Sequence, residues 1–536
     1  MKLRKTVISL LVTPLLIGCS NEISLDFQTP SVDVDSISLG DLKRDSTTGE
    51  IASEGDNVFF DFYEVSDFHG AVNYSVDDRT IGLAKMGDYF SKKRALNPGG
   101  TVILSSGDMY QGSAESNLTH GYIVNYSMNV MGFESMTLGN HEFDWTIDWL
   151  KKNQSLEVEG HKIAYLGANI FDKASGQLLD FLKPSLVIER GDYKVGIVGT
   201  MGDGANKSIM KSLVESVEFK PELDIAKAEA ARLKAEEGCD IVAWSSHKDV
   251  KELTQYGSVK ASGIDVVFGG HTHKNSPGND EPTTYLDGVP YMETENYGRG
   301  ISHARVTLNK SSKEIVNVVG ETQANPYATP DLVEHAEVKK IVDTYNSYID
   351  PIKSKVIGST DGDLEVTDSF TLTNLCVDTM SLAAKKWAKD NGDVKIVAAF
   401  HNAKGGIRDV IKAGDITFGN VYKSFPFDNE VCVVKVKGKN LKAYLNNNTV
   451  NGYGIWVDTE AIPTRDAIDV NADYYFTTTD FMATSDKFVF RLSENDLIRT
   501  GYVVRDVVAA RIESQGKIKK ADFTREHAQF NVPEKY

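Results

Sequence analysis

The chain has 536 residues, which is enough for two or more domains. Its hydrophobic fraction of 41% and its charged fraction of 25% are those of a soluble globular protein. Its net charge of −18 disfavours a general nucleic-acid or anionic-membrane binder, so an anionic substrate would need positive charge supplied locally by metal ions or arginines.

Residues 1–18 have the pattern of an export signal. Cationic residues at positions 2, 4 and 5 precede an apolar run over 7–17 that is too short to span a bilayer. The run ends in Leu-Ile-Gly-Cys, which resembles the lipobox of bacterial lipoproteins, and the resemblance implies cleavage before Cys19 and lipid on that cysteine. Ser20 beside it then implies the outer membrane. An ordinary signal peptide followed by a chance cysteine is the alternative.

The segment after Cys19 carries no sign of chemistry. Residues 19–56 are rich in Ser, Asp and Thr and have little apolar periodicity, so we expect a flexible tether there. The other three cysteines are scattered through apolar or strand-like stretches. We expect them to be buried as small hydrophobic residues, not paired or metal-bound: Cys239, Cys376 and Cys432.

From residue 57 to about 325, β-rich apolar runs alternate with helix-like stretches. Alternation on this scale predicts a layered α/β domain. The expected elements include helices at 81–95, 121–131 and 222–237, strands at 101–108, 194–200 and 240–247, and hairpin strands over 281–310.

An amphipathic stretch at 331–348, which stops before Pro351, predicts a helix that links two domains, and we place the linker at 326–354. A second α/β unit is expected over 355–536. Its strand-like runs lie at 394–400, 430–438 and 473–481.

Five short polar clusters each follow a predicted strand of the first unit. In α/β sheets the carboxyl edge of the strands is where ligands bind. One such cluster is usually a turn or a hydrogen-bonded histidine, but five together favour a metal centre. Two divalent ions need a shared carboxylate, and mixed imidazole, carboxylate and amide ligands suit zinc, manganese or iron. The clusters are Asp67-Phe68-His69, Gly107-Asp108, Gly139-Asn140-His141-Glu142, His247 and Gly270-His271-Thr272-His273.

In this order the motifs resemble those of the metallophosphoesterase superfamily, and the match covers residues 57–320. The resemblance implies an αββα sandwich and two divalent metal ions, with seven residues as ligands. One ion would be held by Asp67, His69 and His273, the other by Asn140, His247 and His271, with Asp108 bridging the two.

His141 is not a ligand in that pattern. The resemblance implies that it faces the leaving group and donates a proton to it. Asp144 follows three residues later, where its carboxylate would orient the imidazole and raise its pKa. A carboxylate placed at a helix N-terminus is the alternative reading of Asp144, and both roles can hold together. Glu142 is expected to support the loop.

The stretch 402–445 resembles the C-terminal domain of 5'-nucleotidases and UDP-sugar hydrolases. The motifs are G-G-I-R, then G-D-I-T-x-G-x-V, then F-P-F-x-N. The resemblance implies a domain that holds a nucleoside between two aromatic rings. From spacing alone, Phe427 and Phe481 would be core residues. Asn402 matches the family's base-contacting asparagine only if one residue is inserted before the glycines. The implied substrate-binding residues are Asn402, Gly406, Arg408, Phe427, Phe481 and Asp486.

Three departures from the family pattern affect the substrate. The loop after Phe481 carries Thr484 and Ser485 where the family has glycines, and it is one residue shorter. No arginine lies between Arg305 and Arg408, although the family has one or more there. Lys404 alters the glycine loop before Arg408 and is a candidate substitute, as a point charge without the guanidinium fork.

Together the patterns predict a lipid-anchored, two-metal hydrolase of extracellular or periplasmic nucleotides in the bacterial cell envelope, of the 5'-nucleotidase type. A UDP-sugar hydrolase or a 2',3'-cyclic-nucleotide phosphodiesterase on the same scaffold is the alternative. A surface binding protein with vestigial activity is less favoured, because every ligand position is filled. The metal identity, the base, the number of phosphates and the oligomeric state are not determined.

Overall fold

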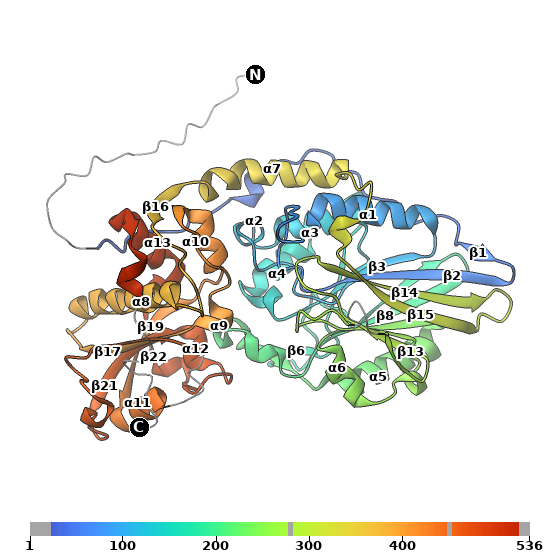
Figure 1. The fold of residues 1–536 in the computed structure, drawn as a ribbon. Helices are drawn as coiled ribbons and strands as arrows, with labels where there is room; N and C mark the ends of the chain where they lie inside the picture. The colour runs from blue at the N-terminus through green and yellow to red at the C-terminus, as the bar shows by residue number, and fades with distance from the viewer. Residues whose placement is uncertain (1–22, 277–281, 447–452, 525–536) are drawn as a thin grey trace, which may run out of the picture.

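The computed structural model describes residues 23–276, 282–446 and 453–524, which form two α/β halves joined by one long helix (Figure 1). The predicted export signal and Cys19 lie outside the described residues. Within the described part of the chain, no helix combines the length and apolar character needed to cross a bilayer.

Two β-sheets lie face to face in the N-terminal half. Side chains from both, among them Phe60, Leu104, Ile197 and Phe268, form one buried cluster between the sheets. The first sheet has the order β15-β14-β2-β3-β4-β5, with β1 beside β2, and the second has the order β12-β13-β11-β10-β8-β7. The strands are β1 (Ser53–Glu54), β2 (Asn57–Val65), β3 (Thr101–Ser105), β4 (Ser135–Thr137), β5 (Ala164–Leu166), β7 (Ser185–Arg190), β8 (Tyr193–Met201), β10 (Ile241–His247), β11 (Val266–Phe268), β12 (Thr284–Leu286), β13 (Val289–Met292), β14 (Gly300–Asn309) and β15 (Ile315–Ala324), and a separate pair is β6 (Ile170–Asp172) with β9 (Val217–Phe219).

Helices cover the outer faces of both sheets, which completes the predicted αββα sandwich. Ala226 and Ala230 pack against the second sheet, and a π-helical turn over Leu233–Glu237 extends their helix to the end of the predicted stretch. The helices of this half are α1 (Gly82–Leu96), α2 (Ala114–Asn117), α3 (Tyr122–Met131), α4 (Ile147–Gln154), α5 (Glu222–Arg232) and α6 (Val250–Leu253).

The central strands of both sheets run parallel and end at one edge of the sandwich. In the first sheet the register pairs Val65 with Ser105, and Ser105 with Met136. In the second sheet Ser245 pairs with Phe268. The loops that follow these strands therefore emerge side by side, and they are the loops that carry the five polar clusters.

The C-terminal half has a five-stranded sheet of order β20-β17-β21-β19-β22 and a three-stranded sheet of order β18-β16-β23. Cys376 and Cys432 are buried in it, and Cys239 is buried in the N-terminal half, all without disulfides, as expected. The elements are β16 (Val356–Thr360), α8 (Thr371–Asp390), β17 (Ile396–Asn402), α9 (Ala403–Gly406), β18 (Gly414–Thr417), α10 (Phe418–Ser424), β19 (Glu430–Lys437), α11 (Gly438–Asn446), β20 (Tyr453–Val457), β21 (Asp473–Thr479), α12 (Asp480–Thr484), β22 (Leu497–Val503), α13 (Val504–Gln515) and β23 (Lys517–Ile518).

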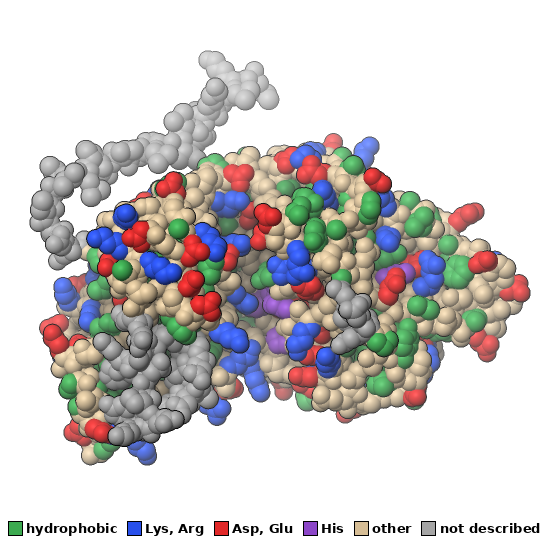
Figure 2. Space-filling model, viewed as in Figure 1, with side chains coloured by type: hydrophobic (Ala, Val, Ile, Leu, Met, Phe, Trp, Pro, Cys, Tyr) green, Lys and Arg blue, Asp and Glu red, His purple; other side chains and the backbone are tan. Residues whose placement is uncertain are grey.

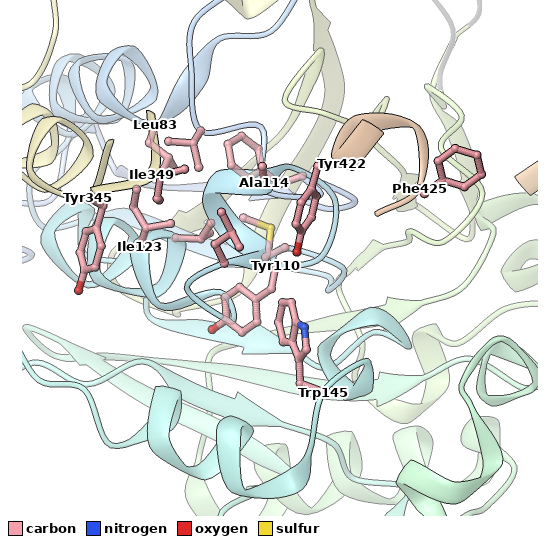
Figure 3. Packing of buried hydrophobic residues seen from close by; sticks show 14 of the residues in the cluster. Leu83, Tyr110, Ala114, Ile123, Trp145, Tyr345, Ile349, Tyr422 and Phe425 are labelled. Carbon is pink, nitrogen blue, oxygen red and sulfur yellow. The ribbon is translucent and has the colours of Figure 1, made fainter. Parts of the chain in front are cut away.

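Helix α7 (Ala336–Lys353) joins the halves, and it does not stop before Pro351 as predicted. One face of the helix, including Tyr345 and Ile349, is buried against α1 and α3. Lys353 in the last turn pairs with the buried Glu115 at 2.5 Å. This packing keeps the last turn helical, although proline removes a backbone donor there. Figure 3 shows Tyr345 and Ile349 in one apolar cluster with side chains of both halves.

The predicted flexible tether is wrong for its described part, because residues 23–52 lie along both halves. Thr29 donates from Oγ1 to Asp506 of α13 at 2.5 Å, and Asp45 accepts from Nε2 of His335 at 3.0 Å. An argument from apolar periodicity does not detect how this segment packs. Five of its apolar side chains are buried against the folded protein: Leu25, Val34, Ile37, Leu39 and Leu42.

Leu25→Ala is expected to lower the melting temperature in scanning calorimetry. Leu25 is 3% exposed, and truncation of a buried leucine costs about 2–5 kcal/mol because it removes apolar contacts and leaves a cavity. Leu96→Ala is the matched control, since Leu96 is 75% exposed and its loss should cost about 0.5 kcal/mol or less. Equal melting temperatures for the two variants would mean that the segment is a tether after all.

Candidate active site

The loops at the sandwich edge hold their polar residues in a strained backbone. Asp67, His69 and Asp108 have positive φ angles of 50°, 48° and 54°. His271 and His273 have φ angles of 79° and 62°. Such conformations cost free energy for residues other than glycine and persist where the surrounding structure enforces them, often at functional sites. All five are residues that the sequence predicts as metal ligands.

These residues converge in two groups. The first is Asp67, His69 and His273, and the second is Asp108, His247 and His271, and in each group the potential ligand atoms lie within 4.8 Å of one another. In the first group Nε2 of His69 is 2.9 Å from Nε2 of His273. In the second group Nε2 of His247 is 3.1 Å from Oδ2 of Asp108. The structure therefore brings six of the seven predicted ligands into two sites.

The chemistry of the groups fits divalent cations. Nδ1 of His69 donates to the carbonyl of Gln111 at 2.8 Å, and Nδ1 of His247 donates to that of Ser106 at 2.7 Å. Each Nε2 then presents a lone pair to the centre, which is the usual second-sphere arrangement of metal-binding histidines. The side-chain oxygen and nitrogen of Asn140, the seventh predicted ligand, are buried with no hydrogen-bond partner among the described residues. A bound cation would satisfy the side-chain oxygen of Asn140.

The electrostatics favour neutral imidazoles at His271 and His273, which is the form that binds metal. Burial, followed by the charge of His247, lowers the pKa of His271 to about 3. Burial, followed by the charge of Arg408, lowers the pKa of His273 to about 4. His247 differs: burial lowers its pKa, but Asp108 and Asp67 together raise it to about 10. Bound metal ions would replace the proton of His247 as the positive charge beside Asp108 and Asp67.

His141 and Asp144 form the predicted pair. Both lie in a 3-10 turn and its cap after β4, where Nδ1 of His141 is 2.7 Å from Oδ2 of Asp144. Burial opposes the charged imidazole, but Asp144 and Asp108 outweigh it and raise the pKa of His141. The backbone N–H of His141 donates to Oδ1 of Asp108 at 2.8 Å, so the dyad is fixed directly beside the second group.

Two glutamates brace the loops, and only one of them stood out in the sequence. Glu142 accepts from the backbone N–H groups of Asp108, Met109 and Gly139, each at 2.8 Å, and so ties two ligand loops together. Glu293 accepts from Oγ1 of Thr272 at 2.7 Å and from the N–H of Val250 at 3.0 Å. Glu293 lies just after a short strand, far from any motif, so no sequence signal pointed to it.

A cavity of about 410 Å³ opens from these groups toward the C-terminal half. Figure 2 shows histidine side chains at the bottom of the hollow between the halves, with lysine and arginine side chains around it. The lining combines residues of the first half with five of the six predicted substrate-binding residues: Asp108, Asn140, His141, Asp144, His271 and His273 with Asn402, Gly406, Arg408, Phe427 and Phe481.

Helix α10 positions Arg408 and Phe427 at this cavity. A capping box between Thr417 and Asn420 starts the helix, and the N–H of Arg408 donates to the carbonyl of Ser424 in its last turn at 2.9 Å. The Arg408 guanidinium lies 5.1 Å from the centre of the Phe427 ring. The same ring stacks on His141, with centroids 5.9 Å apart. Both residues therefore face the dyad.

Three further residues that the sequence predicts to bind substrate, Asn402, Gly406 and Phe481, also line the cavity. Oδ1 of Asn402 is buried and has no hydrogen-bond partner among the described residues, as expected for an acceptor reserved for a ligand. A Cβ at position 406 would lie 2.5 Å from that oxygen, so glycine at this position avoids a clash with the Asn402 side chain. Phe481 packs edge-on against Phe488, with centroids 5.6 Å apart.

Asp486 is the predicted residue that the structure does not bring to the cavity. Its carboxylate is 55% exposed and pairs with Lys211 at 3.5 Å. The next residue, Lys487, lines the cavity in its stead. Asp486 and Lys487 lie in a turn in which the N–H of Phe488 donates to the carbonyl of Ser485 at 3.2 Å. Oγ of Ser485 also donates to the Lys207 carbonyl at 3.0 Å, and this loop geometry sets which of the two side chains points inward.

Two adjoining carboxylate–imidazole groups at the edge of an αββα sandwich define a metal-dependent phosphoester hydrolase with two divalent ions. Residues 60–275 match the family described as calcineurin-like phosphoesterase, and residues 356–460 match the 5'-nucleotidase C-terminal domain. The two matches together span more than half of the sequence. The chain belongs to the metallophosphoesterase superfamily, in the family that carries this 5'-nucleotidase domain.

Relatives and solved structures agree with this assignment. The chain is 24% identical to Protein UshA of Salmonella pullorum over 501 residues, covering 82% of this chain and 87% of the relative. It is 27% identical to a 5'-nucleotidase of Vibrio cholerae over 389 residues, covering 65% and 68%. The fold matches the structure of a 5'-nucleotidase precursor from Thermus thermophilus with a TM-score of 0.67, at 21% identity, covering 86% of this chain and 97% of that one.

Proposed function

We propose that this protein is a 5'-nucleotidase-type enzyme that hydrolyses nucleotide phosphoesters to nucleoside and phosphate. The observation that carries the proposal is the shared cavity, where both candidate metal groups and the His141–Asp144 pair face Asn402, Phe427 and Phe481. The name of one relative, the 5'-nucleotidase of Vibrio cholerae, supports the same substrate class. We assign the catalytic domain to 57–325, the linker to 326–354 and the substrate domain to 355–536.

In the proposed mechanism, Asp67, His69 and His273 would hold one divalent ion and Asn140, His247 and His271 would hold the other, with Asp108 of the second group as the candidate shared ligand. Two such ions would supply Lewis acidity to the phosphoryl oxygens and activate water. His141 donates a proton to the leaving oxygen, because Asp144 and Asp108 outweigh burial and raise its pKa, which favours the protonated imidazole. Asp144 holds Nδ1 of His141 at 2.7 Å, so Nε2 is directed away from the carboxylate and toward the substrate.

The substrate domain provides recognition in this proposal. Arg408 binds phosphate oxygens through its fork of donors, and Asn402 contacts the base. Phe427 and Phe481 sandwich the base, an interaction that tolerates any nucleobase. Asp486, on the present geometry, is not among the recognition residues.

Phe481→Ala is expected to raise KM for AMP about tenfold, since stacking of a base on an aromatic ring contributes about 1–3 kcal/mol. A small aryl phosphate lacks the nucleoside, so its KM should change less than twofold. The comparison uses phosphate release at several substrate concentrations. An equal loss on both substrates would contradict a stacking role.

A substrate panel tests the function itself. A form that lacks residues 1–19 is loaded with Mn²⁺, Zn²⁺ or Mg²⁺ and assayed with AMP, ATP, UDP-glucose and 2',3'-cyclic AMP. Turnover of AMP is the expected result. Bound metal without turnover of any of the four would refute an enzymatic role on nucleotides.

One observation favours UDP-sugar hydrolysis as a second candidate activity. A cavity of about 690 Å³ adjoins the first, shares Gln111, Arg408 and Pro426 with it, and reaches His69 of the first metal group. A substrate that carries groups on both sides of the cleaved phosphoryl group could place one group in each cavity. The UDP-glucose arm of the panel decides between the two activities.

We further propose that the protein is lipid-anchored at Cys19 in the bacterial cell envelope, where nucleotides that cannot cross a membrane would be hydrolysed. The support is the cationic start, the short apolar run and the Leu-Ile-Gly-Cys end of the signal. Incorporation of labelled fatty acid into the wild type and not into Cys19→Ala is the expected result. Equal labelling of both would refute the anchor.

A further inference from the structure

Three cationic side chains line the active-site cavity without an acidic partner. Lys404, Arg408 and Lys487 face it, and none of them forms an ion pair with a described residue. Cations just outside the cavity behave differently, since Lys423 pairs with Asp409 at 2.7 Å and Lys211 pairs with Asp486 at 3.5 Å. In a chain with a net charge of −18, unpaired cations gathered at one cavity indicate a site for an anion.

Lys487 and Arg408 reach the same cavity from different loops of the C-terminal half, since Arg408 follows α9 and Lys487 follows α12. The cavity lining also includes His273 of the first metal group and His271 of the second. Both cations therefore lie in the cavity where a phosphoryl group would meet the metal centre.

The side chain of Lys487 is held in this position by neighbours from both halves. Its Nζ donates to Oγ of Ser208, at the end of a 3-10 turn over Ala205–Ser208 in the N-terminal half. The following residue, Phe488, packs against Phe481, and both rings line the same cavity. Partial burial and then the charge of Arg408 lower the pKa of Lys487, as expected for two cations that converge before an anion arrives.

We propose that Lys487 is a substrate-binding residue that holds phosphate oxygens together with Arg408. It supplies positive charge that the segment between Arg305 and Arg408, which has no arginine, does not provide. As an ammonium it acts as a point charge and needs no fixed oxygen geometry, so it accepts any phosphate ester that reaches the metal centre. The inference rests on the proposed function in that the substrate is a phosphate ester.

The test compares Lys487→Met, which keeps the length of the side chain and removes its charge, with the wild type. KM should rise about tenfold for both AMP and p-nitrophenyl phosphate, while kcat changes less than about threefold, because the lost contact binds the phosphate before and during reaction. Inhibition by inorganic phosphate should weaken by a similar factor. Lys487→Arg should restore most of the affinity, and added salt should narrow the difference between wild type and Lys487→Met.

Two further variants distinguish phosphate binding from a general effect of surface charge or of local packing. Lys211→Met removes the same charge from a lysine that pairs with Asp486 outside the cavity, so KM should stay within twofold of the wild type. Ser208→Ala removes the hydrogen bond of Lys487 and keeps its charge, so it should raise KM less than Lys487→Met does. An unchanged KM in Lys487→Met, or the same loss in Lys211→Met or Ser208→Ala, would overturn the proposal. If the wild type hydrolyses p-nitrophenyl phosphate and not AMP, the nucleotide assignment fails while the Lys487 test remains decisive.

Discussion

His141→Ala is expected to lower kcat by about three orders of magnitude and to leave both metal ions bound. The size follows from the loss of a general acid, which typically contributes about 10²–10⁴-fold. The metals stay because the imidazole of His141 belongs to neither ligand group and is held by Asp144 at 2.7 Å. The measurements are kcat for AMP and the metal content of the purified variant.

The leaving group provides the sharpest control for His141. With p-nitrophenyl phosphate the leaving oxygen needs little protonation, so the same variant should lose much less activity. Asp144→Asn should also lower kcat, and Asp144→Asn combined with His141→Ala should be no worse than His141→Ala alone, because Asp144 acts through His141. Loss of metal from His141→Ala, or equal losses on both substrates, would show that His141 is not the proton donor.

Asp108→Asn is expected to reduce the bound metal from two ions toward one and to abolish most activity. Asp108 lies with His247 and His271 in the second group, and its Oδ2 is 3.1 Å from Nε2 of His247. Its Oδ1 accepts from the N–H of His141 at 2.8 Å. An amide keeps one acceptor oxygen and loses the negative charge that two cations share. Asparagine also tolerates the positive φ of 54° at this position, so the fold should survive.

Metal titration calorimetry measures the affinity of Asp108→Asn directly, without relying on turnover. Asp144→Asn is the matched control, because it makes the same carboxylate-to-amide change beside the centre on a residue that belongs to neither ligand group. The control should bind two ions as the wild type does. Two ions bound to Asp108→Asn with unchanged affinity would refute the bridging role of Asp108.

The ligands of the candidate metal centre were predictable because each lies in a short motif at the end of a strand. Each ligand lies at the end of a buried strand or in the loop that follows it, and parallel strands end at one edge, so residue type and position determine where each side chain arrives. Asp67, His247 and His271 are found where the motif order places them. The His141–Asp144 contact needs only three residues of chain.

The C-terminal half was less predictable, because its recognition residues depend on loops of unequal length. Arg408 and Phe427 sit in an intact motif beside α10 and reach the cavity as expected. Asp486 was expected there too, but the loop is one residue shorter than the family pattern, and Lys487 lines the cavity in its place. The turn that the shortened loop forms over 485–488 points Lys487, and not Asp486, toward the cavity.

The sequence by itself determined the fold class through its apolar periodicity. Through the resemblance of its motifs to the metallophosphoesterases it also determined the two-metal centre and predicted the His141–Asp144 pair, because these residues lie in short motifs of the chain. Only the tertiary structure decided the course of residues 23–52 and which residue of the shortened loop, Lys487, lines the cavity. Both depend on contacts between distant segments, such as Thr29 with Asp506 and Ser485 with Lys207, which are 477 and 278 residues apart. Composition suggested a flexible tether because grooves that bury Leu25 and Leu39 exist only once both halves have folded.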